Sequence, residues 1–265
     1  MSKKSDPSVP NLINEKNLSY AWAKAFLFAK QNSGTEISPL IISISGFDQS
    51  GAPTEDLRLR AALDKALSAK NRRSIENVAF TIFPQRLWQI AQGDRNALFR
   101  MYMDAYPRYV ARNKSGNSRG LYFQRLITQG PESTQGNQLE WILSQFEARA
   151  GVRDSMFQAS IFDPSRDHTS TAQLQFPCLQ HVSFDRTKKG LVLNSFYATQ
   201  KLFSKAYGNY LGLSQLGAFM AHEMGIQLAR VNVFIGVEKL DEYPKSDPVY
   251  DPLVEIANEA VKESK

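Results

Sequence analysis

Apolar residues recur at helical spacing in some segments of the chain and at strand spacing in others, with no fixed order between the two. Residues 20–30 (YAWAKAFLFAK) have the spacing of an amphipathic helix. Residues 40–44 (LIISI) are rich in β-branched side chains and predict a buried strand. Further helices are predicted at 55–70, 85–91, 137–149, 209–225 and 252–262, and further strands at 78–83, 153–162, 191–196 and 231–236. This irregular alternation predicts an α+β fold.

The two ends of the chain differ in composition from its middle. The first dozen residues combine lysine, serine, aspartate and two prolines, so we expect residues 1–16 to form a loose arm, with order beginning near Asn17. Residues 17–242 are expected to form one domain, because a chain of 265 residues can build a single large core. Prolines and charges then precede an exposed final helix, which makes 243–265 a C-terminal extension.

Composition suggests a location and excludes some classes of protein. With 42% hydrophobic and 22% charged residues, the chain resembles a globular protein rather than a disordered or fibrous one. No apolar run is long enough to cross a membrane, and the first residues lack the apolar segment of a secretory signal. We therefore expect no membrane partner and a cytoplasmic location. The single cysteine, Cys178, and three scattered histidines argue against a disulfide framework and a metal site.

Net charge narrows the choice of partner only slightly. Lysine and arginine number 32, against 26 aspartates and glutamates, and the net charge of +6 favours anionic partners such as nucleotides. The basic residues are dispersed along the chain rather than gathered in one block. A nucleic-acid partner therefore rests on net charge alone and is the least favoured alternative.

The lone cysteine lies in a motif whose chemistry is known. The run PCLQHVSF resembles the segment Pro-Cys-His-x-x-x-Gln-Phe of thymidylate synthases, with matches at Pro177, Cys178 and Phe184. Leu179 and Ser183 depart from it. The cysteine of that family is its nucleophile, so the resemblance gives Cys178 this catalytic role. In an arbitrary protein, however, a lone cysteine is more often an inert buried residue.

Spacing supports the motif. From Cys178 to Asp241 the family pattern fits this sequence without a gap. Asn209 then falls on the asparagine that reads the pyrimidine edge, and Gly236 falls on a glycine of the family's Gly-Gly-Asp segment. In both this sequence and the family, a long helix follows the asparagine.

Three upstream motifs extend the resemblance. Trp88 and residues 92–96 resemble Trp-x-x-Gln-Gly-Asp-Thr-Asn, with one extra residue after the tryptophan. Residues 120–122 resemble Gly-Pro-Val-Tyr and place Tyr122 among the substrate-binding residues, while 137–139 resemble an Asp-Gln helix start. In order and spacing, the chain resembles a divergent member of the thymidylate synthase and pyrimidine nucleotide hydroxymethylase family.

The resemblance implies a fold, a reaction and partners. The fold is a mixed sheet packed with helices over residues 17–242, and the outer face of that sheet pairs with a second subunit in a homodimer. In the reaction, a thiolate adds to C6 of a deoxyuridine ring, which makes C5 nucleophilic toward a folate-borne one-carbon unit. A pyrimidine nucleotide or related ring would be the substrate, and 5,10-methylenetetrahydrofolate the donor.

The phosphate clamp of the family is altered here. In the gapless register, Ala198 replaces a clamp arginine and Thr199 replaces the neighbouring serine, so the hydroxyl is kept and the charge is lost. The arginines that family members lend across the dimer map to Arg153 and Asp154, so only one is kept. These changes remove charge-assisted contacts that would position a phosphate.

The proton-transfer residues of the family are also replaced. Its general-base glutamate maps to Arg86, or to Gln85 if the gap is placed differently. Its aspartate, histidine and tyrosine in the second half map to Lys201, Lys239 and Asp241. A guanidinium cannot organise the water that a carboxylate would hold, so the usual mechanism is in doubt.

The replacements leave two functions open. Arg86, Lys201 and Lys239 would point into one cavity if the fold is kept, which predicts a new anion site and a lowered pKa for Cys178. Solvated side chains on a cleft rim are the alternative. The first function is C5 one-carbon transfer through Cys178, with Asn209 reading the base. The second is a catalytically reduced homologue that binds a nucleotide or a protein partner.

Overall fold

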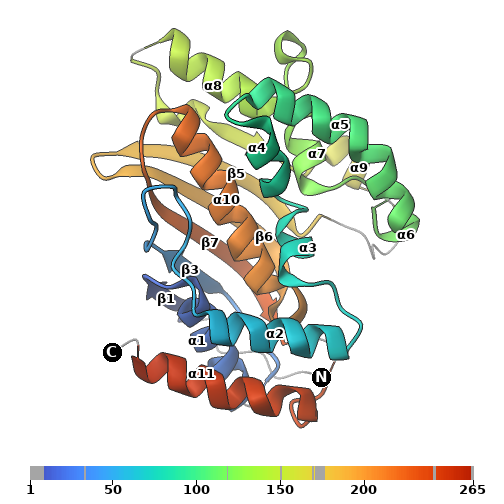
Figure 1. The fold of residues 1–265 in the computed structure, drawn as a ribbon, viewed down its shortest axis with the longest axis vertical. Coiled ribbons are helices and arrows are strands. Elements are labelled where there is room, and N and C mark those ends of the chain that lie inside the picture. The colour runs from blue at the N-terminus through green and yellow to red at the C-terminus, as the bar shows by residue number, and fades with distance from the viewer. Residues whose placement is uncertain are drawn as a thin grey trace.

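Seven strands pair into one open mixed sheet (Figure 1). The structure is a computed structural model that describes residues 9–32, 34–117, 119–149, 151–168, 170, 177–240 and 243–263. In sheet order the strands are β1 (Asn11–Glu15), β3 (Leu40–Ile44), β7 (Leu228–Lys239), β6 (Gly190–Lys201), β5 (Leu179–Thr187) and β4 (Gln158–Ser160), and β2 (Glu36–Ile37) pairs with the end of β7. The pairs β1–β3 and β6–β7 are parallel, and the other pairs are antiparallel.

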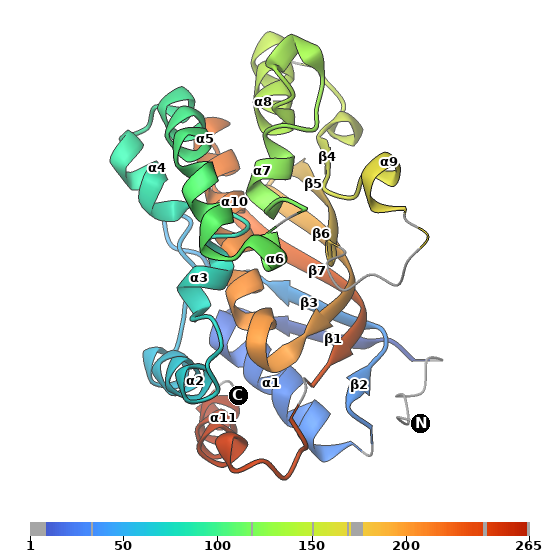
Figure 2. The ribbon, with the colours of Figure 1, turned by 90° about the vertical axis from the view of Figure 1, so that its right-hand side faces the viewer.

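Helices pack against one face of this sheet (Figure 2). The α-helices are α1 (Leu18–Gln31), α2 (Leu57–Ala69), α3 (Ile75–Ala79), α4 (Gln85–Ala91), α5 (Arg95–Arg112), α6 (Lys114–Asn117), α7 (Tyr122–Leu126), α8 (Gln138–Ala148), α9 (Pro164–Asp167), α10 (Tyr207–Glu223) and α11 (Asp251–Glu263). Short 3-10 turns occupy Glu132–Thr134, Asp154–Met156 and Pro248–Tyr250, and a π-helical turn, Leu202–Ala206, leads from β6 into α10. The mixed sheet and single domain agree with the predicted fold class.

Helix α10 lies at the centre of the core. It packs on β6 and β7, and α1, α3 and α8 also contact it. Two of its glycines, Gly208 and Gly212, face α3 so closely that a Cβ on either would come within 2.7 Å of a backbone oxygen, that of Ile75 and Ala79 respectively. The missing side chains therefore allow the two helix backbones to touch, and this contact fixes the position of α3.

The N-terminal segment departs from the expectation of a loose arm up to residue 16. Residues 11–15 form β1, which pairs in parallel with β3, and Ile13 packs against the core. A strand at the edge of a sheet gains its hydrogen bonds from its neighbour, so its own composition gives little sign of it. Residues 1–8 of the expected arm lie outside the described residues.

The final helix was expected to be exposed, and this prediction is wrong. On α11, Leu253, Ala257 and Ala260 are fully buried. The helix packs on α1 and α2, as Figure 1 shows at the lower end of the molecule. The C-terminal helix is therefore packed into the domain, against α1 and α2, and is not an exposed extension.

The strand predicted at 78–83 is also wrong. The side chain of Ser74 accepts a hydrogen bond from the Asn77 backbone and caps α3, and turns follow that helix as far as Phe83. The strand predicted at 153–162 shrinks to residues 158–160. The apolar run at 78–83 is buried against α10, so its hydrophobicity reports burial rather than strand structure.

Several elements follow the sequence closely. Strand β3 has the predicted bounds, and α1, α2, α4 and α8 each agree with a predicted helix to within two residues at either end. Among the described residues, none of the helices combines the length and the apolar character needed to cross a membrane.

The contact between α10 and α3 can be tested with Gly212→Ala. In an isolated helix this change would stabilise by about 1 kcal/mol. Here the new Cβ would press on the Ala79 backbone, and we expect a net loss of about 1–2 kcal/mol in the free energy of unfolding, measured by urea denaturation. Gly151→Ala is the matched control, because a Cβ there meets no atom within 4 Å. A stabilised Gly212→Ala protein would contradict the close packing.

Candidate functional site

Cys178 lies directly before β5, beside the end of β6. Its carbonyl oxygen accepts a hydrogen bond of 3.1 Å from the backbone of Ala198. The thiol is half-buried, and burial raises its pKa, while the positive charges of Lys201 and Lys205 act in the opposite direction. The net direction is upward, so the thiol is held protonated near neutral pH. Lys201 thus acts in the expected direction, but the net shift of the Cys178 pKa is upward instead of the expected lowering.

The structure brings Tyr122 to this cysteine. Burial and the neighbouring Cys178 raise the pKa of the Tyr122 hydroxyl, and hydrogen bonds from the backbone amides of Leu179 and Cys178 offset part of that rise. Tyr197 on β6 neighbours both side chains, and burial raises its pKa well above the ordinary range. We call Cys178, Tyr122 and Tyr197 the Cys178 centre.

The other residues of the predicted site are divided between this centre and distant positions. Lys201, at the end of β6, acts on the Cys178 thiol, and Thr199 lies two residues before it. Asn209 occupies the first turn of α10 and is only 5% exposed. Its neighbour Tyr210 acts on Tyr197, which places this turn of α10 beside the Cys178 centre.

Three cations predicted to share one cavity do not do so. Lys201 and Lys239 are register partners at the ends of β6 and β7, but Lys239 is held by Glu36 at 3.0 Å. Arg86 is exposed on α4, which packs on α5, away from the strand ends (Figures 1 and 2). The charges that lower the thiol pKa come from Lys201 and Lys205 instead. The anion site predicted from Arg86, Lys201 and Lys239 is therefore wrong.

Two more predicted positions have other surroundings. Arg153 is exposed before a 3-10 turn, and its neighbour Asp154 is paired with Arg186 at 2.6 Å. Asp241 lies outside the described residues. Among the described residues, no three His, Cys, Asp or Glu side chains gather where they could hold a metal ion.

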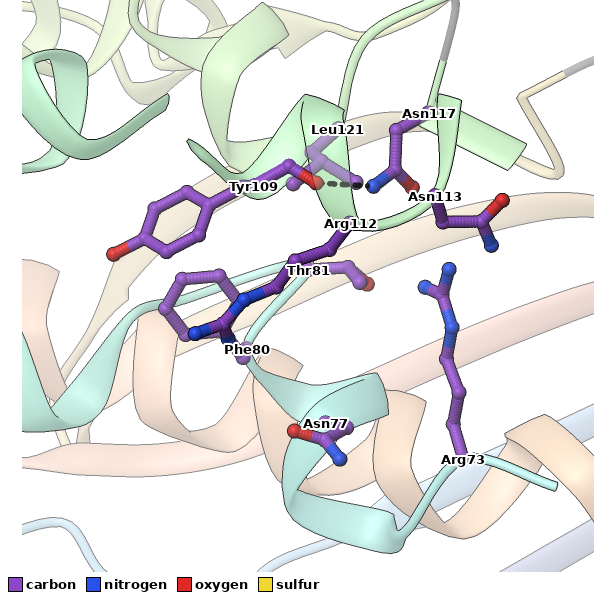
Figure 3. A pocket seen from close by; sticks show the side chains of 9 residues that line it. All are labelled: Arg73, Asn77, Phe80, Thr81, Tyr109, Arg112, Asn113, Asn117 and Leu121. Carbon is purple, nitrogen blue, oxygen red and sulfur yellow. Dashed lines mark hydrogen bonds between the residues drawn. The ribbon is translucent and has the colours of Figure 1, made fainter. Parts of the chain in front are cut away.

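A cavity of about 330 Å³ opens between α3, α5, α6 and the residue before α7 (Figure 3). It is lined by Arg73, Asn77, Phe80, Thr81, Tyr109, Arg112, Asn113, Asn117 and Leu121. Cys178 is not part of the lining, but Leu121 directly precedes Tyr122 of the Cys178 centre. The two features are therefore neighbours along one short segment of chain.

Two arginines give the cavity its charge. Arg73 enters from the α3 side and Arg112 from the α5 side (Figure 3). Within the described part of the chain, neither takes part in a salt bridge, and the lining contains no acidic side chain. Arg95, by contrast, at the start of the same helix α5, contacts Glu140, Glu147 and Glu223. The cavity therefore presents positive charge without internal compensation.

Rings and amides complete the wall. Phe80 and Tyr109 pack edge to face, with centroids 4.8 Å apart. The Asn117 amide nitrogen donates to the Tyr109 carbonyl at 2.9 Å, while its Oδ1 is buried and has no hydrogen-bond partner among the described residues. Such an atom costs free energy unless a ligand or water satisfies it.

A buried ion pair holds the segment that joins the cavity to the Cys178 centre. The Arg125 guanidinium binds both carboxylate oxygens of Asp167, at 2.6 and 2.9 Å, and also the carbonyls of Arg119 and Ile161. Burial alone would raise the pKa of Asp167, but the hydrogen bonds from Arg125 and the Asp163 backbone lower it below its ordinary value. Leu121 and Tyr122 thus lie between Arg119, whose carbonyl is bound, and Arg125, which is held by Asp167.

None of the residues that line this cavity was among the predicted site residues. Arg73 and Asn77 adjoin the segment 78–83, where the pattern predicted a strand, and Tyr109 and Arg112 lie on α5, which was not predicted. One signal was present in the sequence: Asp94 is an N-cap residue that accepts from the Ala97 backbone. Pro107 within α5 conceals the helix, because proline normally interrupts one.

Nothing in this arrangement points to the folate donor that the resemblance implies. The cavity of about 330 Å³ does not include Cys178, beside which that donor would have to bind. The C-terminal helix α11 is packed on α1 and α2 and does not cover the Cys178 centre. We therefore derive no chemical step through a folate.

Comparison with known proteins identifies no family: no protein-family model matches the chain, and no curated protein matches its sequence.

The upward direction of the Cys178 pKa gives a clean test, because the chain has one cysteine. We expect the rate of labelling by a thiol reagent to follow an apparent pKa above the about 8.5 of a free thiol. Lys201→Ala should raise that pKa further, because the lysine charge favours the thiolate. Lys188→Ala, in the exposed turn after β5, should leave it unchanged. An apparent pKa clearly below 8 would contradict the assignment.

Proposed function

We propose that this chain is a catalytically reduced protein of thymidylate-synthase-like fold that binds a nucleotide in the cavity between α3 and α5. The fold assignment is supported by the order of the motifs: Cys178 lies directly before β5 and beside β6, and Asn209 lies in the first turn of the long helix α10. The function is supported by one observation above all, the pair of uncompensated arginines that faces the rings of the cavity.

The cavity suits the parts of a nucleotide. Arg73 and Arg112 supply planar, permanently charged donors for a phosphate. Phe80 and Tyr109 offer an aromatic surface on which a base can stack, and the Asn117 Oδ1 can accept from an exocyclic amine or ring N–H. A volume of about 330 Å³ is sufficient for one such ligand.

Binding is better supported than one-carbon transfer. Attack on a ring carbon needs a thiolate, and the Cys178 pKa is shifted in the direction that disfavours it. The retained cysteine, and Asn209 in the first turn of α10, then have packing roles.

The outer face of the sheet supports a homodimer as part of the same proposal. Phe196 and Phe234 are register partners on β6 and β7, their rings stack at 5.5 Å, and they are 38% and 39% exposed. Large apolar side chains at the centre of an uncovered sheet face are typical of a subunit interface.

The dimer predicts a change of mass. Phe234→Glu would place a charge in the interface at each copy, and we expect light scattering after gel filtration to report a monomer where the unaltered chain reports a dimer. Leu57→Glu, at another exposed apolar position, is the control that should remain dimeric. A monomeric unaltered chain would contradict the proposal.

The binding proposal is tested by calorimetry and thermal shift with dUMP, dCMP and their nucleosides. Monophosphates should raise the melting midpoint and nucleosides should do so far less. Arg73→Ala or Arg112→Ala should each weaken monophosphate binding about 10- to 100-fold, the loss of one charged hydrogen-bonding partner.

Two further variants separate the alternatives. Arg100→Ala, on α5 but outside the lining, and Cys178→Ser should both bind as the unaltered chain does. Equal affinity for nucleosides and monophosphates would contradict the phosphate role of the arginines. Loss of nucleotide binding in Cys178→Ser would shift the site to the Cys178 centre and favour the enzyme.

A further inference from the structure

The elements that border the cavity carry further basic side chains. Two of them, Arg108 and Arg112, lie one turn apart on α5, and the charges of both act on the cavity residue Tyr109, whose pKa burial raises and these charges lower. Lys114 is exposed on the next helix, α6. These positions are close in sequence, and the helix turn places Arg108 and Arg112 on the same side of α5.

A second pair of basic side chains extends the cluster to α9. The Arg119 guanidinium donates to the Arg166 carbonyl at 3.4 Å, and the Arg166 charge acts on Tyr106, one turn before Tyr109. We call Arg108, Lys114, Arg119 and Arg166 the basic rim. The acids beside the rim are Asp104, exposed on α5, Asp163, which caps α9, and Asp167, which is paired with Arg125. The charge of Arg166 acts on both Asp163 and Asp167, although no described salt bridge joins them to it.

The rim carries more charge than one nucleotide requires. A phosphate monoester has a charge of roughly −1.5 to −2 at neutral pH, which Arg73 and Arg112 alone would balance. The four cations of the rim, of which only Arg166 has carboxylates acting on it, would then be in excess of the charge of that phosphate. Further phosphates outside the cavity would account for them, and consecutive phosphates joined to a base are found along a nucleic-acid strand.

The cavity restricts the form of that strand. Its volume admits one base beside Phe80 and Tyr109, so the base must lie outside a duplex. Stacking of a base on an aromatic surface next to a track of cations is how proteins bind single strands with little sequence preference.

We propose, on the basis of the nucleotide site above, that the chain binds single-stranded nucleic acid, with one nucleotide in the cavity and the neighbouring phosphates along the basic rim. From the sequence alone such a partner was the least favoured alternative, because the basic residues are dispersed along it. The fold brings together cations from α5, α6, α9 and the segment between α6 and α7.

The test compares ligands of one chemistry and different length. Anisotropy of a labelled oligodeoxynucleotide of about eight residues should report tighter binding than calorimetry finds for dUMP, by at least tenfold, with a marked dependence on salt. The matching duplex and a deoxynucleoside triphosphate should not show this gain.

The double variant Arg108→Gln, Arg166→Gln isolates the rim. It should weaken oligonucleotide binding by about 10-fold or more and reduce the slope of log K against log salt by about 2, while dUMP binding stays unchanged. Lys188→Gln, Lys189→Gln, which removes the same charge from the turn between β5 and β6, should change neither ligand's affinity. The melting midpoint of each variant shows whether it is folded. If the double variant does not fold, the single variant Arg108→Gln takes its place, and it should reduce the slope of log K against log salt by about 1.

Each other outcome is decisive. Binding of dUMP with no gain for the oligonucleotide, a duplex that binds as tightly, or an unaffected double variant would overturn this inference and leave the nucleotide site intact. Tight, rim-dependent binding of the triphosphate would assign the rim to a free nucleotide and also overturn it. Failure of both dUMP and the oligonucleotide to bind would overturn the proposed function itself.

Discussion

The burial of α10 between the sheet and the surrounding helices is the constraint on which the rest of the structure depends. Its apolar residues face β6 and β7 on one side and α1, α3 and α8 on the others. Because Gly208 and Gly212 carry no side chain, α3 rests directly on its backbone. This contact places Asn77 and Phe80 at the cavity, so the packing of a central helix determines the geometry of the proposed binding site.

The opposite wall depends on an interaction of another kind. Arg125 and Asp167 form a fully buried pair, and the guanidinium also holds two backbone carbonyls. Breaking such a pair leaves an uncompensated charge in the core, which costs about 3–5 kcal/mol. The segment with Leu121 and Tyr122 is therefore rigid where it separates the cavity from Cys178. Two rigid walls lined by uncompensated arginines are what a site for a small anion requires.

The sequence predicted those parts of the fold whose signals are local. Strand β3 and helix α8 have strong periodicity and clear ends, and the structure has both. The run at 78–83 was wrongly assigned to a strand, because a short apolar segment has the same pattern in a strand and in a buried helix. Its actual structure depends on the contact with α10, which the sequence does not show. Helix α5 carries Pro107, which conceals it. Residues 11–15 pair in parallel with β3, which lies elsewhere in the sequence, so their own composition did not indicate a strand.

For the site, too, the sequence predicted local motifs but not contacts between distant residues. The motif with Cys178 and Tyr122 was visible in the sequence, and the structure brings both together. Charge partners were not visible: Lys239 is held by Glu36, and Arg86 lies on a different part of the surface. Arg73 and Arg112 are 39 positions apart and become a pair only in the fold. Pairing of distant side chains depends on tertiary structure, which spacing within a motif does not report.

The location of the ligand is the central claim, and hydrogen–deuterium exchange with and without dUMP tests it most directly. If dUMP occupies the cavity, backbone amides in residues 73–81 and 109–121, the two sides of the cavity, should exchange more slowly. Protection confined to the first residues of β5 and the end of β6, around Cys178, would contradict it and return the site to the cysteine.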